Sequence, residues 1–231
     1  MYVYGKNVAE EILKKGEKIQ KALIWDKFSD RKLISAIQKR EICIKFCAKK
    51  DLDKFANGNH QGIILCIPDY EYCDVSEFIS NENSLVVILD HLEDPHNLGA
   101  IIRTCEAAGV NGIIIPKDRS VSVNSTVMKV SAGALENMKI ASVTNLSNTI
   151  KYLKDNDFWI VGTDMNGTNY DEIDYSGKIA IVIGNEGKGM SKVVRDSCDF
   201  IASIPMKGVI NSLNASVAAG IVIYEAIKPR K

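Results

Sequence analysis

From residue 85 onward, short apolar runs alternate with segments of helical periodicity. The runs that predict strands are Leu85–Asp90, Gly112–Pro116, Lys139–Val143, Phe158–Gly162, Ile179–Gly184 and Phe200–Ile204. Helices are expected at about residues 97–109, 124–131, 145–156, 190–198 and 212–227. Strands that are apolar along their whole length and separated by helices are typical of a parallel sheet covered on both faces. In such an α/β sheet, ligands bind at the carboxyl ends of the strands.

A smaller α/β unit precedes this sheet. Strands are expected near residues 22–25, 42–47 and 62–67, and helices near 8–13, 29–37 (capped by Ser29) and 49–56. The polar, acidic stretch from Pro68 to Ser84 interrupts the pattern and is interpreted as a linker. The predicted domains are therefore residues 1–67 and 85–231, joined by 68–84. The first 70 residues hold 14 basic and 9 acidic side chains, whereas the rest of the chain holds 15 and 20, which suggests different roles for the two units.

Composition excludes several classes of protein. A chain of 231 residues, 46% hydrophobic and 25% charged, is globular rather than disordered. Its first 20 residues lack the pattern of a signal peptide, and its apolar runs are too short to span a membrane. The six cysteines lie mostly in apolar segments, which favours free thiols in the cytoplasm. The three histidines do not fall into zinc-binding spacing, so no metal site is expected.

Three segments carry unusual residues. In the first, a strand leads into an acidic loop and a helix that contains Asn97 and Arg103; by residue type alone, Arg103 is a surface arginine. The second, Ile183–Gly189, follows a strand and holds three glycines, but with neither P-loop nor dinucleotide-binding spacing, so a simple tight turn also explains it. In the third, Ser212 is expected to cap the last helix, with Asn214 in its first turn able to direct an amide at a bound group.

In order and separation, these segments resemble the three motifs of the SpoU/TrmH family of RNA ribose 2′-O-methyltransferases, in the SPOUT superfamily. The matching residues are Asn97-x-Gly99-x-x-x-Arg103, then Ile183-Gly184-Asn185-Glu186-Gly187-x-Gly189, then Ile204-Pro205-Met206 with Ser212-Leu213-Asn214-x-Ser216. The stretch Pro116–Ser120 is similar to the branch that methylates a guanosine of 23S ribosomal RNA. The segments Tyr4–Val8 and His60–Ile64 extend the resemblance to a ribosomal-protein-like RNA-binding domain at the N-terminus.

The resemblance implies a C-terminal SPOUT domain with a deep trefoil knot, a homodimer, and S-adenosylmethionine as cofactor. Five residues would contact this cofactor: Thr163, Gly184, Ile204, Met206 and Leu213. The first module carries a net charge of +5, which supplies the attraction that RNA phosphates require.

The resemblance also implies catalytic roles. Arg103 is often proposed as the base in this family, but an arginine keeps its proton in proteins, so we favour a role in gripping a phosphate and orienting the hydroxyl. Asn97 and Glu186 would orient Arg103 or the nucleotide, and Asn214 would hold the ribose or the cofactor. Two alternatives stay open: a tRNA substrate (or a ribosome-methylating enzyme of antibiotic resistance), and a non-catalytic RNA-binding relative. A dehydrogenase is disfavoured because no glycine fingerprint follows an early strand.

Overall fold

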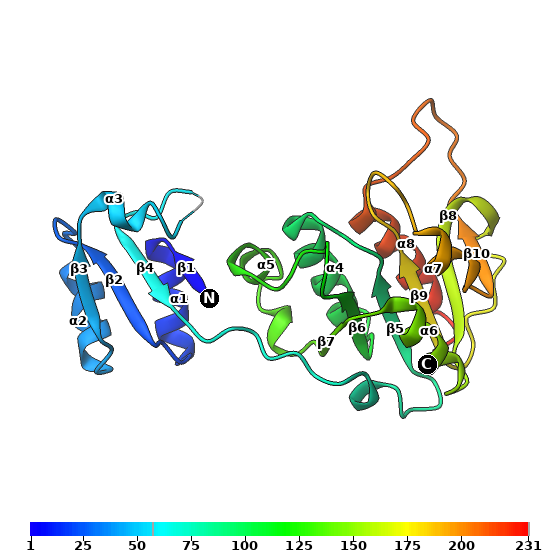
Figure 1. Ribbon diagram of the computed structural model, residues 1–231, viewed down its shortest axis with the longest axis horizontal. Coiled ribbons are helices and arrows are strands. Elements are labelled where there is room, and N and C mark those ends of the chain that lie inside the picture. The colour runs from blue at the N-terminus through cyan, green and yellow to red at the C-terminus, as the bar shows by residue number, and fades with distance from the viewer. Residues whose placement is uncertain (57, 231) are drawn as a thin grey trace. The chain divides into compact units, whose positions relative to one another are not determined.

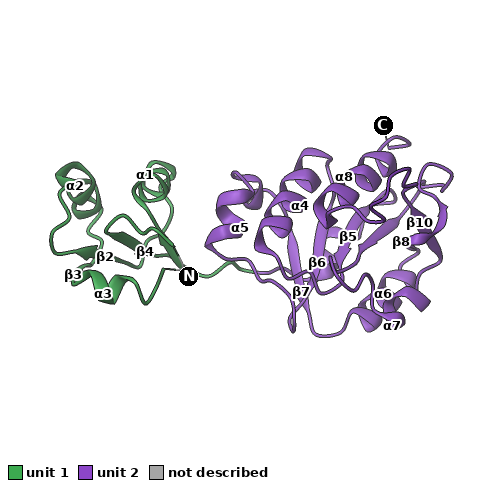
Figure 2. Cartoon of the chain, turned by 90° about the horizontal axis from the view of Figure 1, so that it is seen from above, with its two compact units in different colours: residues 1–71 green, residues 72–231 purple. Residues whose placement is uncertain are grey.

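The computed structural model describes residues 1–56 and 58–230 (Figure 1). They form two units, Met1–Glu71 and the residues from Tyr72 on, each built around its own β-sheet (Figure 2). The α/β class predicted from the sequence is confirmed for both. No helix in the described part of the chain has the length and apolar character needed to cross a membrane.

The first unit is a four-stranded mixed sheet in the order β1-β4-β2-β3. β1 and β2 run antiparallel to β4, and β3 runs parallel to β2. Figure 2 shows α1 and α2 on one side of the sheet and α3 on the other. The elements are β1 Tyr2–Tyr4, α1 Lys6–Lys15, β2 Lys21–Trp25, α2 Arg31–Lys39, β3 Ile44–Cys47, α3 Lys49–Leu52 and β4 Ile63–Cys66.

Local sequence explains where these helices begin and end. Gly16 closes α1 in the left-handed conformation with φ of 75°, which glycine adopts without a steric penalty. α2 is capped by Asp30, not by Ser29 as predicted, because the Asp30 carboxylate accepts a hydrogen bond from Leu33 N at 3.2 Å. β1 was not predicted, since three residues are too few to show a strand pattern.

The second unit is a six-stranded parallel sheet in the order β10-β8-β9-β5-β6-β7. Figure 2 shows α4, α5 and α8 on one face and α6 and α7 on the other. The strands are β5 Leu85–Leu89, β6 Gly112–Pro116, β7 Ile140–Val143, β8 Trp159–Asn169, β9 Ile179–Ile183 and β10 Phe200–Ser203. The helices are α4 Pro95–Ala107, α5 Ser125–Val130, α6 Leu146–Lys154, α7 Lys192–Asp196 and α8 Ala215–Ala226, with short 3₁₀ turns η1 Val75–Phe78 and η2 Ala134–Glu136.

Two elements differ from the prediction in ways that affect the site. β8 continues to Asn169, well beyond the predicted end at Gly162, because its last residues pair with β10 after a register shift between Ile201 and Ala202. α8 starts at Ala215 instead of residue 212, which leaves residues 204–214 as a long loop. The trefoil knot implied by the resemblance stays a prediction.

The segment predicted as a linker, 68–84, belongs largely to the second unit. Cys73 pairs with Ala141 of β7 in a parallel bridge, and Phe78 is buried in the core of this unit. Gly112 leaves room for that ring, since a Cβ there would lie 2.4 Å from the Phe78 side chain. The stretch was predicted to be a linker because most of its residues are polar. Its buried apolar side chains are those of Val75, Phe78 and Ile79, which are too few to show a pattern.

Candidate functional site

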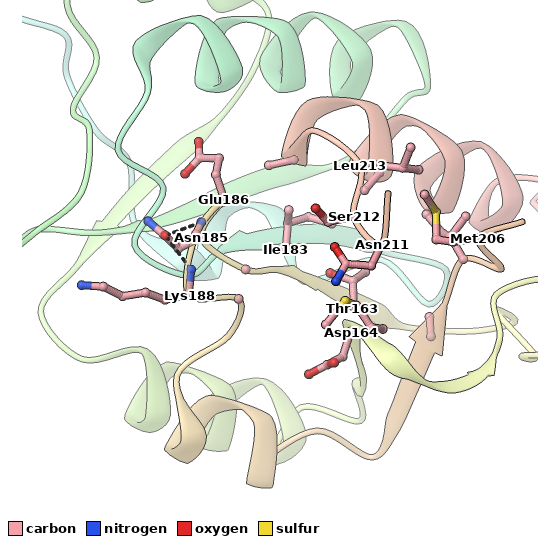
Figure 3. A pocket seen from close by; sticks show the side chains of 18 residues that line it. Thr163, Asp164, Ile183, Asn185, Glu186, Lys188, Met206, Asn211, Ser212 and Leu213 are labelled. Atoms are coloured by element: carbon pink, nitrogen blue, oxygen red, sulfur yellow. Dashed lines mark hydrogen bonds between the residues drawn. The ribbon is translucent and has the colours of Figure 1, made fainter. Parts of the chain in front are cut away.

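A cavity of about 420 Å³ opens where two loops of the second unit meet a segment of β8 (Figure 3). Its walls come from residues 163–165 within β8, from the glycine-rich loop that follows β9, and from the long loop between β10 and α8. Both loops follow the carboxyl ends of parallel strands, which is where the sheet type predicts a ligand site. The volume lies within the range typical of small-molecule sites, about 300–1,000 Å³.

All five residues predicted to contact a cofactor line this cavity: Thr163, Gly184, Ile204, Met206 and Leu213. The Thr163 hydroxyl donates a hydrogen bond to the Val182 carbonyl at 2.9 Å, which ties β8 to β9 beside the cavity. At Gly184, an added Cβ would lie 2.5 Å from Gly189 C and Met190 N, so this loop closes on itself only because the side chain is absent.

Asn185 gives the glycine-rich loop its shape, a role the sequence did not reveal. Its Oδ1 accepts hydrogen bonds from Gly187 N at 2.9 Å and Lys188 N at 3.2 Å, as the dashed lines in Figure 3 show. Its Nδ2 donates to the carbonyl of His91 at 2.8 Å, which ties this loop to the one after β5. An asparagine beside glycines is a known turn signal, and that spacing was the clue available from sequence.

Asp90 was also missed. It is buried at the carboxyl end of β5, where Oδ2 accepts a hydrogen bond from Ser191 N at 2.6 Å and Oδ1 lies 2.6 Å from Nδ1 of His91. His91 has φ of 58°, a left-handed conformation that is uncommon outside glycine and asparagine. A buried carboxylate requires such partners, so Asp90 fixes the start of α7 relative to the loop of motif one.

The structure joins three of the four predicted catalytic residues in one hydrogen-bonded chain. Asn97, in the first turn of α4, donates Nδ2 to Glu186 Oε1 at 2.7 Å and accepts at Oδ1 from Asn214 Nδ2 at 2.9 Å. Asn214 is itself the N-cap of α8, a position predicted for Ser212, and its Oδ1 accepts from Ser216 N. One buried amide thus links all three motifs.

Arg103 is not part of this chain. It lies six residues after Asn97 on α4, which at about 3.6 residues per turn places it on a different side of the helix. Its side chain is exposed, and it does not line the cavity. An exposed guanidinium is suited to bind an incoming anion such as a phosphate.

A further charged residue, Asp164, lines the cavity beside Thr163. Partial burial opposes its ionisation, but a hydrogen bond from Arg195 Nε at 2.9 Å and backbone N–H groups outweigh this, so the pKa of the Asp164 carboxyl lies below its ordinary value. The Asp164 carboxyl is therefore ionised near neutral pH and is paired with Arg195.

Comparisons with known proteins agree with this geometry. A model of the SpoU rRNA methylase family matches residues 84–224, and a model described as RNA 2′-O ribose methyltransferase substrate binding matches residues 2–73. A TrmH family tRNA/rRNA methyltransferase of Staphylococcus saprophyticus is 44% identical over 237 residues, which cover 99% of this chain and 95% of that protein. A counterpart from Staphylococcus aureus is also 44% identical, over 99% of this chain and 96% of its own.

Among solved structures, an rRNA methyltransferase from Sinorhizobium meliloti with bound AdoMet has a TM-score of 0.74 at 25% identity, covering 100% of this chain and 87% of that one. A tRNA modifying enzyme of the TrmH/SpoU type from A. aeolicus has a TM-score of 0.59 at 32% identity, covering 67% of this chain and 79% of that one. The matched residues span both units and include all three motifs of the cavity. The chain belongs to the SpoU/TrmH family of RNA 2′-O-ribose methyltransferases and carries the family's substrate-binding domain at its N-terminus.

Proposed function

We propose that this chain transfers a methyl group from S-adenosylmethionine to the ribose 2′-hydroxyl of a guanosine in 23S ribosomal RNA. The observation that carries the proposal is the cavity in which five predicted cofactor-contacting residues meet, next to the hydrogen-bonded chain Asn97–Glu186–Asn214. The relative from Sinorhizobium meliloti, described as an rRNA methyltransferase, binds AdoMet and matches the chain over its whole length.

The residues present fit this cofactor. Ile204, Met206 and Leu213 give the cavity apolar walls, and Gly184 lets the backbone of its loop approach a ligand closely. When bound, S-adenosylmethionine would supply a methyl group activated by a positively charged sulfur. A ribose oxygen would bond to the methyl carbon in line with the carbon–sulfur bond, which would break to leave the neutral thioether, and the hydroxyl proton would pass to water. Holding the two reactants in position lowers the activation barrier of such a displacement by several kcal/mol. The displacement itself needs no metal.

The side chains around the cavity divide this positioning work. Asn97 holds the loops of motifs two and three next to α4, because its Nδ2 donates to Glu186 and its Oδ1 accepts from Asn214. Arg103 is exposed and binds the phosphate beside the target nucleotide, directing the hydroxyl toward the cavity. Since an arginine keeps its proton, we assign Arg103 to orientation and charge stabilisation rather than to proton removal.

We favour ribosomal RNA over tRNA as the substrate because the rRNA and tRNA enzymes cover different shares of this chain. The rRNA methyltransferase from Sinorhizobium meliloti covers the whole chain, including the substrate-binding unit. The A. aeolicus tRNA modifying enzyme covers only 67% of this chain. The six cysteines are all free thiols, which supports the cytoplasm as the location of this reaction.

We also infer that the active form is a homodimer. α8 buries Ala219 and Val222 but presents exposed Val217 and Tyr224 at helical spacing, and Val209 and Ile210 of the preceding loop are exposed as well. A second copy of the chain would cover this apolar surface. Val217→Asp is expected to give a monomer in light scattering, and a variant that remained a dimer would contradict this inference.

The deciding experiment offers methyl-labelled S-adenosylmethionine with unmodified 23S rRNA and with bulk tRNA, and maps the label by nuclease digestion and mass spectrometry. Label on a 23S guanosine ribose is expected. Label on tRNA would overturn the substrate, and cofactor binding without labelling of either RNA would point to an assembly intermediate as the substrate. A protein that binds RNA but not the cofactor would be a non-catalytic relative.

Arg103→Ala tests the assigned role. Methyl transfer is expected to fall at least about a hundredfold while the fold and cofactor binding are retained, because the side chain is exposed and outside the cavity. Lys151→Ala, which removes an exposed cation from α6 on the other face of the second unit's sheet, is the control and should leave the rate unchanged. Full activity of Arg103→Ala would refute the assignment.

A further inference from the structure

A second cavity, of about 300 Å³, lies in the first unit on the face of the sheet opposite α1 and α2. The strand register determines which residues face it. Tyr2 of β1 and Lys21 of β2 both pair with Cys66 of β4, and Leu23 pairs with Lys45 of β3. Directly opposed residues share a face of a sheet, so these side chains line one surface.

One wall of this cavity is aromatic. The rings of Tyr2 and Phe55 lie 4.7 Å apart between centroids at an interplanar angle of 43°, and they are 41% and 43% exposed. Leu23 and Cys47 form the floor. Burial, followed by the charge of Asp51, raises the pKa of the Cys47 thiol, so it is neutral and the floor is apolar. Two half-exposed rings over an apolar floor form a stacking platform.

The rim is positively charged. Lys21, Lys45 and Lys54 line the cavity together with a single carboxylate, Asp51. Asp51 is paired with Lys54, whose Nζ lies 2.8 Å from its Oδ1. The lining therefore carries a net charge of +2, contributed by Lys21 and Lys45. An aromatic platform beside two cations matches a nucleobase with its adjoining phosphates.

We propose that this cavity, which nothing in the family match assigns by residue, binds one unpaired nucleotide of the RNA substrate. The base stacks on Phe55, with the inclined ring of Tyr2 packed beside it, and the flanking phosphates contact Lys21 and Lys45. The proposal rests on the RNA methyltransferase function above and identifies where the substrate-binding unit holds single-stranded RNA. Paired bases are excluded because their faces are already stacked in a helix.

The first test measures binding of the full-length protein to a fluorescent oligouridylate by anisotropy, with no methyl donor present. Phe55→Ala is expected to weaken binding about tenfold, within the range observed when a stacking ring is removed. Phe46→Ala is the control: this residue of β3 is 53% exposed but points to the other face, because its neighbours Lys45 and Cys47 face the cavity. It should bind as wild type does.

The second test addresses the cations with variants that leave the sheet intact. Lys45→Gln should lower the slope of log affinity against log salt by about 0.7, the value for one phosphate contact to a single strand. Lys39→Gln, which removes an exposed lysine on α2, should leave the slope unchanged. Thermal unfolding of each variant establishes that the fold is retained.

Three outcomes would overturn the proposal. They are undiminished oligouridylate binding by Phe55→Ala and Lys45→Gln, equal affinity for a duplex of the same length, and equal affinity for free uridine monophosphate, which would make the occupant a mononucleotide. Because no methyl transfer is measured, failure of the catalytic function would show in the labelling experiment alone, with oligouridylate binding unaffected.

Discussion

The substitution Asn97→Asp tests whether one buried amide holds the three motifs together. Asn97 is 5% exposed, donates to Glu186 at 2.7 Å and accepts from Asn214 at 2.9 Å. The introduced carboxylate keeps the shape of the side chain and the bond from Asn214. It replaces the donor toward Glu186 with an oxygen, so two carboxylates face one another.

The expected cost follows from two terms. A hydrogen bond to a charged group contributes about 1.5–3 kcal/mol to stability. Two like charges about 4 Å apart repel by about 1 kcal/mol in water and about 4 kcal/mol at a protein surface. Glu186 is exposed and its side chain can turn toward solvent, so the smaller repulsion applies. The free energy of unfolding should therefore fall by about 3 kcal/mol at pH 8.

The assay is urea denaturation of wild type and variant at pH 8 and pH 5. Two adjacent carboxylates in the folded variant bind a shared proton more readily than the separate carboxylates of the unfolded chain. Lowering the pH therefore stabilises the folded variant, and its loss in free energy of unfolding relative to wild type should shrink by about half at pH 5. Glu186→Gln, added to Asn97→Asp, supplies an amide donor to the new carboxylate and should restore most of the lost stability.

The rescue makes the reasoning refutable. A double variant as unstable as the sum of the two single variants would show that Asn97 and Glu186 do not interact across the loops. A single variant with wild-type stability at pH 8 would show that the 2.7 Å contact contributes nothing in solution.

Three further predictions concern the cavity and the core. Gly184→Ala should lower S-adenosylmethionine affinity at least about tenfold in calorimetry, because its Cβ would lie 2.5 Å from the backbone of the same loop; Gly208→Ala, with open space around it, should not. Asp164→Asn should be less stable than wild type at pH 7, and the difference should vanish as the pH falls below 3.8, because the stability from the lowered pKa of Asp164 is lost once that carboxyl is protonated. Phe78→Ala should cost about 3–5 kcal/mol in urea denaturation, since its ring is buried in the second unit.

Each of these has a contrary outcome. Equal affinity of the two glycine variants would mean that the loop of motif two opens without effect on the cofactor. A stability difference for Asp164→Asn that did not shrink between pH 7 and pH 2.5 would assign it to lost packing instead of charge. A nearly neutral Phe78→Ala would return residues 72–84 to the role of a linker.

The strands and long helices of the second unit follow from the sequence because continuous apolar runs identify buried parallel strands. Leu85–Leu89 and Ile179–Ile183 are buried throughout, as such runs suggest, but their pairing with one another and the order of the strands were not predicted. Extensions that depend on tertiary contacts were not predictable. The last residues of β8 form a strand because they pair with β10. The sequence around Gly167 has no strand periodicity that would have predicted this extension.

The five residues expected to contact a cofactor were identified through resemblance, and the cavity that they line could not have been derived from periodicity. Thr163, Gly184 and Leu213 come from three segments with no common pattern, and only the folded sheet brings them together. The supporting residues Asp90 and Asn185 were missed for a different reason. Each acts through hydrogen bonds to a loop far along the chain, and a strand-terminal aspartate or a turn asparagine has many local explanations.

The choice of asparagine at two of the motif positions has a physical basis that local propensity obscures. Asn97 and Asn214 lie at the starts of α4 and α8, and asparagine is a poor helix former; from the sequence, Asn214 was expected in the first turn of a helix capped by Ser212. Yet the bonds from Asn97 span 89 and 117 positions, to a carboxylate acceptor and to an amide donor. The carboxamide of Asn97 donates from its nitrogen and accepts at its oxygen, so one side chain satisfies both partners at once. Aspartate lacks the donor and leucine lacks both groups, so neither could join the three motifs through these two bonds.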